Sequence, residues 1–270
     1  MSENRPFSME TAACDEEYEP SSEYDSSFAL QIFAAREAVF KILAKESLSI
    51  HEKLIVILDM GSKIQQCINT DEYDNIKSVV NDYLKEGIAH TLDETRNLSD
   101  SGQFEDISLQ QGIRQILYPY EEMEVLNPEW EVILKDIIDS LFEQMSDEEY
   151  NILNEEFGTY MVSRAYEYRQ LLEYLVFRYF AKSIYDYDFL GKCQMLVTNF
   201  FVIRQMDIIR WLDNHREYSF KDRMDVVHIF SRQVEYSEDN IENLYEDFIF
   251  DDIFKTDSLI AILWIDSENI

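Results

Sequence analysis

The amino-acid sequence predicts an all-α fold, an irregular array of many helices, and three observations lead to it. Only 6 Gly and 4 Pro occur among 270 residues, too few for the many tight turns of a sandwich or a barrel. Apolar residues recur at spacings of three and four along most of the chain, and no strand-like alternation competes with this period. Hydrophobic residues make up 46% of the chain, enough to fill a continuous core.

The composition predicts a tail and one large domain. Residues 1–26 are rich in Glu, Asp and Ser and lack an apolar stripe, which indicates a disordered acidic tail. Residues 27–270 are expected to form a single all-helical domain, and any subdivision of it is expected near residues 88–127.

Cap and breaker residues place the helices of the first third of the chain. A first helix is expected over Phe28–Ala44. Ser49 and Glu52 have the spacing of a capping box, so a second helix is expected to begin there. A third helix is expected from Thr70 to Gly87, since Gly is a common helix terminator. Residues 88–108 lose the apolar period and contain NLSDSGQ, so they are expected to form a mobile loop.

The same signals place the later helices. A helix over Leu109–Leu117 is expected to end before Pro119, because proline disfavours helical geometry in the preceding residue. Asn127 followed by Pro128 predicts a restart, with Asn as the cap and Pro in the first turn. Further helices are expected after the caps Ser146, Ser219 and Ser237, over Gly158–Tyr185 and Phe189–Asn214, and at a last apolar segment, Leu259–Trp264.

The formal net charge is -32, and it is unevenly spread. Residues 1–27 carry -7 and residues 233–270 carry -10, whereas residues 164–232 carry +2. So large an acidic excess repels nucleic-acid phosphates and anionic lipids, so neither a nucleic acid nor a membrane is expected as a partner. The excess is consistent with a solvated surface, with an acidic face for a basic protein partner, or with a mimic of nucleic acid.

Several kinds of site are excluded by spacing. No two glycines lie closer than ten residues apart, so neither a Rossmann loop nor a P-loop is present. The four histidines and three cysteines show no metal-ligand spacing, and Cys67 and Cys193 are expected in the core. No apolar run reaches the ~20 residues that span a bilayer. With no signal pattern at the N-terminus, a cytoplasmic bacterial protein is expected.

The sequences of two stretches rich in aromatic and charged residues resemble those of a known family. Two stretches are similar to the C-terminal helical region of flagellin lysine-N-methylases: EYLVFRYFAKSIYDYDF and FSRQVEYSEDNIENL. The motif of the first stretch is Glu173–Phe180, and the motif of the second is Glu235–Asn240. Tyr236 stands where that family usually has His. Arg36–Leu58 also resembles a family segment, with Lys53 where Arg is usual. The resemblance covers about residues 28–247.

The resemblance implies methyl transfer from S-adenosylmethionine to flagellin lysines. Family members typically begin with a Cys-rich segment suited to a metal or cluster, and this sequence has Cys14 alone there. It is therefore interpreted as a fragment, as a divergent relative, or as a chain that needs another for catalysis. No catalytic residue and no cofactor is evident from spacing alone. The guanidinium group of Arg suits a carboxylate ligand. The residues proposed to bind a ligand or partner are Arg169, Glu173, Arg178, Glu235 and Asn240.

Two functional hypotheses follow. In the first, the chain is related to lysine-N-methylases and binds a flagellin-like protein, either as an S-adenosylmethionine-dependent methyltransferase or as an inactive form. In the second, it is a non-enzymatic acidic helical module that holds a basic protein partner. The charged pairs on the aromatic-rich stretches are consistent with exposed surface pairs as well as with a site. The oligomeric state stays open.

Overall fold

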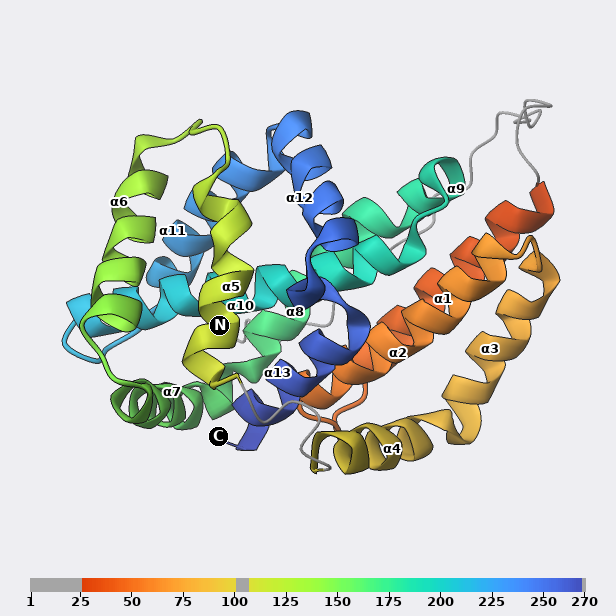
Figure 1. Ribbon diagram of the computed structural model, residues 1–270, viewed down its shortest axis with the longest axis horizontal. Coiled ribbons are helices and arrows are strands. Elements are labelled where there is room, and N and C mark those ends of the chain that lie inside the picture. Colours follow the sequence, from red (N-terminus) through yellow and green to blue (C-terminus); the bar gives the residue numbers. More distant parts are fainter. Residues whose placement is uncertain (1–25, 101–106, 269–270) are drawn as a thin grey trace. The chain divides into compact units, whose positions relative to one another are not determined.

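The structure is a computed structural model that describes residues 26–100 and 107–268, and every regular element in these ranges is helical (Figure 1). No strand occurs among these residues, which confirms the predicted all-α class. The tail predicted over residues 1–26 lies outside the described residues, apart from Ser26 at the start of the first helix. The chain divides into two compact units, each formed from two stretches of sequence.

Unit 1 contains residues 26–93 and 163–196. Its helices are α1 (Ser26–Leu43), α2 (Ile50–Asn69), α3 (Ile76–Asp82), α8 (Ala165–Tyr179) and α9 (Ser183–Asp186), with 3-10 turns at Tyr73–Asn75 and Phe180–Lys182 and a π turn at Tyr83–Gly87. α1 packs against α2, α3 and α8, and α2 also packs against α3 and α8. The second stretch of sequence therefore completes the core that the first three helices begin.

Helix α2 begins where the capping box was predicted. The Ser49 hydroxyl accepts from the Glu52 amide at 3.1 Å, and the Glu52 carboxylate accepts from the Ser49 amide at 2.7 Å. These two bonds satisfy amide donors that have no partner within the helix. The helix is buried on nearly all sides in its middle. There Gly61 lies so close to Cys193 that a Cβ built on it would be 2.5 Å from the cysteine sulfur.

Unit 2 contains residues 94–100, 107–162 and 197–268 of the described chain. Its helices are α5 (Leu109–Glu121), α6 (Pro128–Ile137), α7 (Asp147–Met161), α11 (Phe220–Phe230), α12 (Glu238–Phe250) and α13 (Thr256–Glu268), with π turns at Ile138–Glu143 and Ser231–Glu235 and a 3-10 turn at Asp252–Phe254. The chain passes between the units within α4 (Ile88–Asp100), a 3-10 turn (Val162–Arg164) and α10 (Phe189–Asp213).

The predicted caps of unit 2 are confirmed. Asn127 accepts from the Glu129 amide at 3.2 Å, with Pro128 in the first turn of α6. Ser146, Ser219 and Ser237 each accept from the amide three residues on, at the starts of α7, α11 and α12. Each cap and its amide partner lie within one helical turn, so no tertiary contact is needed to form them.

The loop predicted over residues 88–108 is wrong for its first part, because α4 is helical from Ile88 to Asp100, and Gly87 lies within a π turn rather than at a helix end. The apolar period is lost there because threonines take up buried positions. The Thr91 hydroxyl donates to the Asp59 carboxylate at 3.0 Å, and the Trp264 indole donates to the Thr95 hydroxyl at 3.2 Å. Residues 101–106 lie outside the described residues.

The helix end predicted before Pro119 is also wrong, since α5 continues through Pro119 to Glu121. Tertiary contacts of the next residue hold this last turn. The Tyr120 hydroxyl is buried and donates to the Asn199 side chain at 2.7 Å, and the Trp130 indole donates to the Tyr120 carbonyl at 3.3 Å. Proline removes one backbone donor, and these contacts offset that loss.

The single long helix predicted over Gly158–Tyr185 is divided in three. It breaks at the 3-10 turn Val162–Arg164 and again at the 3-10 turn Phe180–Lys182. At the first break, Arg164 leaves α-helical geometry, and its guanidinium Nε donates to the Glu167 carboxylate at 2.7 Å. The second break ends α8 directly after Tyr179.

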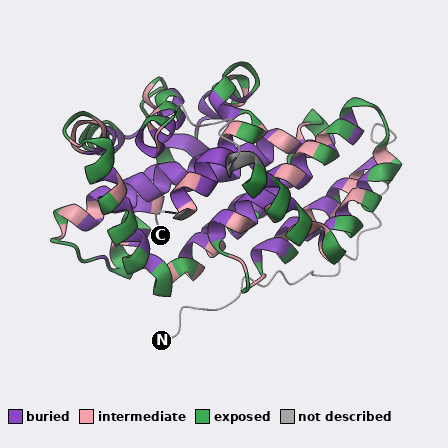
Figure 2. Cartoon of the chain, turned by 60° about the horizontal axis from the view of Figure 1, so that its bottom comes forward, coloured by how far each residue is buried: buried purple, intermediate pink, exposed green. Residues whose placement is uncertain are grey.

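Buried residues lie on the sides of the helices that face other helices, and exposed residues lie on the outer sides (Figure 2). Cys67 and Cys193 are buried as predicted. In unit 2, α10 is buried on most of its surface and carries Asp207, which pairs with the buried Arg223 from α11. A buried carboxylate is tolerated when a cation and further donors surround it, and the Tyr218 hydroxyl also donates to Asp207.

Candidate functional site

Two of the five predicted site residues form a loose ion pair on α8 of unit 1. Arg169 Nη1 and Glu173 Oε1 lie 3.9 Å apart, beyond hydrogen-bond distance. Glu173 is 6% exposed, and its Oε2 is buried without a hydrogen-bond partner among the described residues. Burial raises the pKa of Glu173, and the nearby Arg169 and Lys53 charges oppose that rise. The pair therefore leaves hydrogen-bonding capacity unused on both side chains.

The third predicted residue, Arg178, lies on an exposed part of α8. Its Nε donates to the Tyr179 hydroxyl at 3.1 Å, and its guanidinium lies 5.5 Å from the centroid of the Tyr179 ring. The Lys182 ammonium lies 5.5 Å from the same centroid. Arg178 therefore forms a cation–π cluster.

The remaining two predicted residues lie in unit 2, where Glu235 bonds to a neighbouring side chain and Asn240 bonds to backbone. Glu235 accepts from the Ser231 hydroxyl at 2.6 Å within one π turn. Asn240 is 1% exposed, and its side-chain oxygen accepts from the Glu124 amide at 3.0 Å. Its side-chain nitrogen donates to the carbonyls of Glu124 and Gln233, both at 3.1 Å. Asn240 thus ties the chain between α5 and α6 to the start of α12.

A pocket of about 220 Å³ lies in unit 1 between the start of α2 and the start of α8, and Arg169 is part of its wall. We call it the Lys53 pocket, because its most buried charge is that lysine. Glu46 and the cap Ser49 also line it. The full lining is Ala44, Glu46, Leu48, Ser49, Ile50, Lys53, Ala165, Tyr166 and Arg169.

Lys53 is not among the five predicted residues, although it lies in the Arg36–Leu58 stretch on which the resemblance was based. It is 5% exposed, and its ammonium makes no hydrogen bond or ion pair with any other residue in the described ranges. Burial lowers the pKa of Lys53, and the Arg169 charge lowers it further, against the raising effect of Glu173 and Glu46. An anion bound beside a buried cation that has no ion-pair partner stabilises the charged form of that cation.

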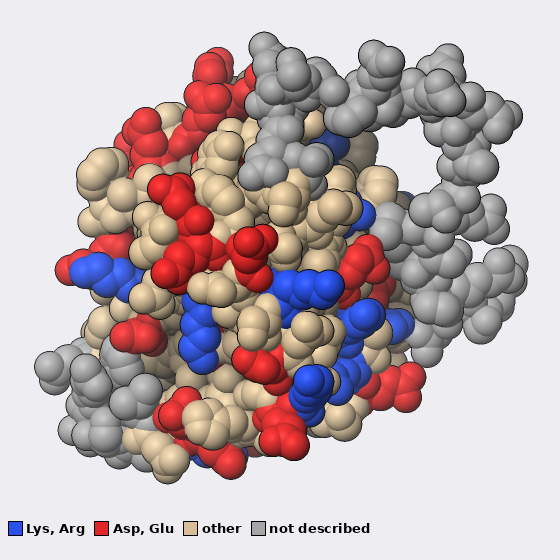
Figure 3. Space-filling view, turned by 90° about the vertical axis from the view of Figure 1, so that its right-hand side faces the viewer, with Lys and Arg blue, Asp and Glu red and all other residues tan. Residues whose placement is uncertain are grey.

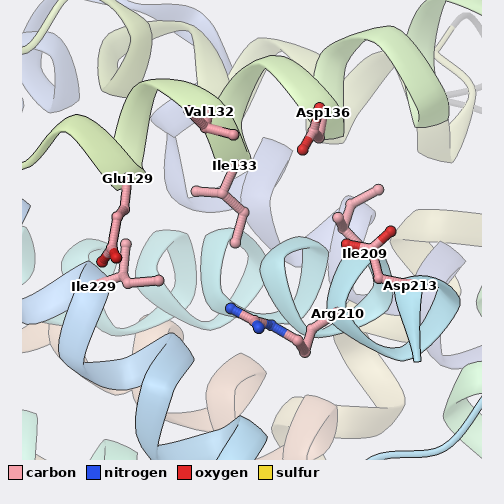
Figure 4. A pocket seen from close by; sticks show the side chains of 8 residues that line it. All are labelled: Glu129, Val132, Ile133, Asp136, Ile209, Arg210, Asp213 and Ile229. Atoms are coloured by element: carbon pink, nitrogen blue, oxygen red, sulfur yellow. The ribbon is translucent and has the colours of Figure 1, made fainter.

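A second pocket, of about 280 Å³, lies in unit 2 between α6, α10 and α11 (Figure 4). We call it the acidic pocket. In Figure 4 the side chains of α6 point towards α10, with Asp136 and Asp213 towards one end and Glu129 towards the other. The lining consists of Glu129, Val132, Ile133, Asp136, Ile209, Arg210, Asp213 and Ile229.

The acidic pocket joins an apolar floor to a charged rim. Ile133, Ile209 and Ile229 are buried, whereas the three carboxylates are exposed, and they outnumber the single guanidinium of Arg210. The Arg210 charge also acts on Asp222, where it helps to lower the pKa of that carboxyl. The pocket therefore has the chemistry for a long aliphatic side chain that ends in a cation, as a lysine does.

The sequence contains part of the signal for this pocket. Glu129, Val132, Ile133 and Asp136 follow the spacing of three, four and seven that puts residues on one helix face. For this region only a helix start at Asn127 and Pro128 was predicted. The partner face on α10 could not be chosen from sequence, because that helix is apolar on most of its surface.

One face of the molecule carries mixed charges. On the face drawn in Figure 3, Lys and Arg side chains gather among Asp and Glu side chains. Within the described ranges, no group of three or more His, Cys, Asp or Glu side chains is placed to hold a metal ion. None of the helices described is both long and apolar enough to cross a membrane.

Within the described residues these features define the class of protein: an all-helical chain of two compact units, each with a pocket in which charged groups meet apolar walls. Residues 36–262 match the FliB lysine N-methylase C-terminal domain. The chain belongs to that family, and the predicted resemblance to the C-terminal region of lysine-N-methylases is confirmed. Comparison with curated proteins and with solved structures found no match.

Proposed function

We propose that this chain serves the N-methylation of lysine in flagellin or a flagellin-like protein, and that it holds the substrate lysine in the acidic pocket. Membership of the lysine N-methylase C-terminal domain family supports a methylase-related role. The choice of lysine as the side chain that is bound rests on one observation: three rim carboxylates and an isoleucine floor occur in one pocket.

In this proposal, the lysine stem lies on Ile133, Ile209 and Ile229, where its methylene groups leave water. The ε-ammonium reaches the rim, where Asp136 and Asp213 stabilise its charge, and it releases a proton to solvent before its nitrogen accepts the methyl group. Methylation keeps the positive charge of lysine, so the pocket accommodates the methylated product as well as the substrate. The acidic pocket thus selects a cationic side chain by charge and by length.

S-adenosylmethionine is the methyl donor that this proposal requires, and its sulfonium supplies the methyl group when it is bound. Lys53 and Arg169 are suited to its carboxylate, because both are cations that line one pocket, and within the part of the chain that the structure describes only Arg169 of the two has an ion-pair partner, Glu173 at 3.9 Å. The proposal therefore assigns only the amino-acid end of the donor to the Lys53 pocket, and the sulfonium with its methyl group lies outside it.

Binding of a lysine-containing flagellin segment to the full chain tests the substrate part, and isothermal titration calorimetry measures it. We expect the Asp136→Asn, Asp213→Asn double variant to bind about ten-fold more weakly, since exposed ion pairs contribute up to about 1 kcal/mol each. Glu242→Gln with Glu246→Gln is the matched control, because both residues are exposed on α12 and the charge change is equal.

Acetylation of the lysine in the segment should weaken binding to the wild-type chain to a similar extent, because it removes the charge. Equal affinity of the Asp136/Asp213 variant and wild type would contradict the proposal. Transfer of labelled methyl groups from S-adenosylmethionine to flagellin then tests activity. Binding of the lysine segment without transfer would support the inactive form of the first hypothesis.

The net charge of -32 favours a second candidate function, a non-enzymatic module that holds a basic protein partner. Here many exposed carboxylates act together, so the Glu242/Glu246 control would weaken binding as much as the acidic-pocket variant. Affinity would also fall steeply with salt, because exposed charges are screened. Affinity that does not change with salt would contradict this second function.

A further inference from the structure

We propose that the Lys53 pocket binds the zwitterionic end of an α-amino acid, either as a free amino acid or as the amino-acid end of a larger ligand such as S-adenosylmethionine. The inference deepens the donor part of the proposed function. It stands on the Lys53 pocket alone, so it does not depend on whether the acidic pocket holds lysine.

The pocket presents two cations to a ligand, and of the two only Arg169 has an ion-pair partner among the described residues. Lys53 is 95% buried yet makes no hydrogen bond or ion pair in the described ranges, and Arg169 reaches Glu173 only at 3.9 Å. An amino group and a planar guanidinium that line one pocket suit the two oxygens of a carboxylate. The pocket also lies at the N-terminus of the 20-residue helix α2, whose dipole favours an anion.

The pocket also presents an anion, which distinguishes an amino acid from a simple anion. Glu46 lines the same pocket, is exposed, and makes no ion pair with another described residue. It lies close enough to Lys53 to raise that group's pKa. In an α-amino acid the ammonium and the carboxylate are attached to one carbon, so a binding site must present both signs of charge within a short distance. Phosphate and sulfate would gain nothing from Glu46.

Size and polarity of the walls limit the rest of the ligand. About 220 Å³ is below the range of pockets that enclose drug-sized ligands, roughly 300–1,000 Å³. The pocket therefore holds an amino-acid group and not a whole nucleoside-bearing molecule. Leu48, Ile50 and Tyr166 supply apolar wall area for the side chain. A ligand as large as S-adenosylmethionine would extend out of the pocket beyond its amino-acid end.

Binding of four probes to the full chain without flagellin tests the inference, with calorimetry as the measurement. We expect L-methionine to bind, and N-acetylmethionine and methioninol to bind at least about ten-fold more weakly, because each lacks one charge of the zwitterion. If S-adenosylmethionine also binds, the site serves the end of the larger ligand. If it does not, the site serves a free amino acid. Absence of L-methionine binding at millimolar concentration would overturn the inference.

Two variants place the binding in this pocket. Lys53→Met and Arg169→Gln should each weaken methionine binding by about ten-fold or more, because each removes a charge-assisted hydrogen bond. Lys41→Met is the matched control, since Lys41 is exposed on α1 of the same unit and does not line the pocket. Far-UV circular dichroism checks that the variants fold. Wild-type affinity in a folded Lys53→Met variant would overturn the assignment, whatever the result at the acidic pocket.

Discussion

Replacing Gly61 by alanine should destabilise unit 1, although alanine is the better helix former. A Cβ at position 61 would lie 2.5 Å from the sulfur of Cys193 and 3.2 Å from its Cβ, whereas carbon contacts prefer 3.5–4.0 Å. Cys193 is fully buried, so its sulfur has little room to move. The overlap is about 1 Å, which requires the two helices to separate or the cysteine to leave its rotamer.

The expected magnitude follows from two opposing effects. Overpacking of a filled core costs about 1–3 kcal/mol, and the change from Gly to Ala in a helix stabilises by about 1 kcal/mol. We therefore expect Gly61→Ala to lower the free energy of unfolding by about 1 kcal/mol. Adding Cys193→Ala removes the sulfur atom, so the double variant should be more stable than the sum of the single changes predicts, by about 1 kcal/mol.

Urea unfolding followed by circular dichroism at a helical wavelength measures these free energies. Gln66→Ala is the control, because Gln66 is exposed on α2 and reports helix propensity without a steric effect. A Gly61→Ala variant at least as stable as wild type, or a double variant whose effects add, would refute the packing of Gly61 against Cys193.

Three further predictions concern a cap, the buried lysine and the helix that sequence missed. Ser219→Ala should destabilise by about 1 kcal/mol. It should also raise the pKa of Asp222 towards its ordinary 3.8. Burial raises that pKa, whereas the hydrogen bonds from Ser219 and Asn214 and the Arg210 charge together hold it down, and the variant loses the bond from the Ser219 hydroxyl. Wild type should lose this stabilisation as pH falls through the lowered pKa of Asp222. An NMR titration of the carboxyl measures the pKa, and urea unfolding measures the stability. Without ligand, Lys53→Met should raise the melting temperature, since burial lowers the pKa of Lys53 and so disfavours its charged form in the fold. For the same reason wild-type stability should increase as pH rises towards 10.5, and the variant should lack that increase. Backbone amides of residues 92–97 should be protected in hydrogen exchange, and Trp264→Phe should reduce that protection by removing the bond to Thr95.

The family motifs could be found from the sequence, but their structural roles could not. Asn240 and Glu235 belong to a motif that can be recognised in the sequence. In the structure, however, the Asn240 side chain bonds to backbone and the Glu235 side chain bonds to a neighbouring serine. Arg169 does line a pocket, and the residue that makes this pocket a candidate site is Lys53, 116 residues earlier in the chain. Pairing these two requires knowing that α2 and α8 pack together.

By itself, the sequence determined the helical class, the helix starts at Ser49, Asn127, Ser146 and Ser219, and the family. Each cap works because its partner amide lies two or three residues away, so local sequence contains the whole interaction. Only the tertiary structure decided that α4 is a helix and that α5 continues through Pro119. It also decided which charges share a pocket, because these outcomes depend on contacts between side chains far apart in sequence, and local propensity is too weak to override them.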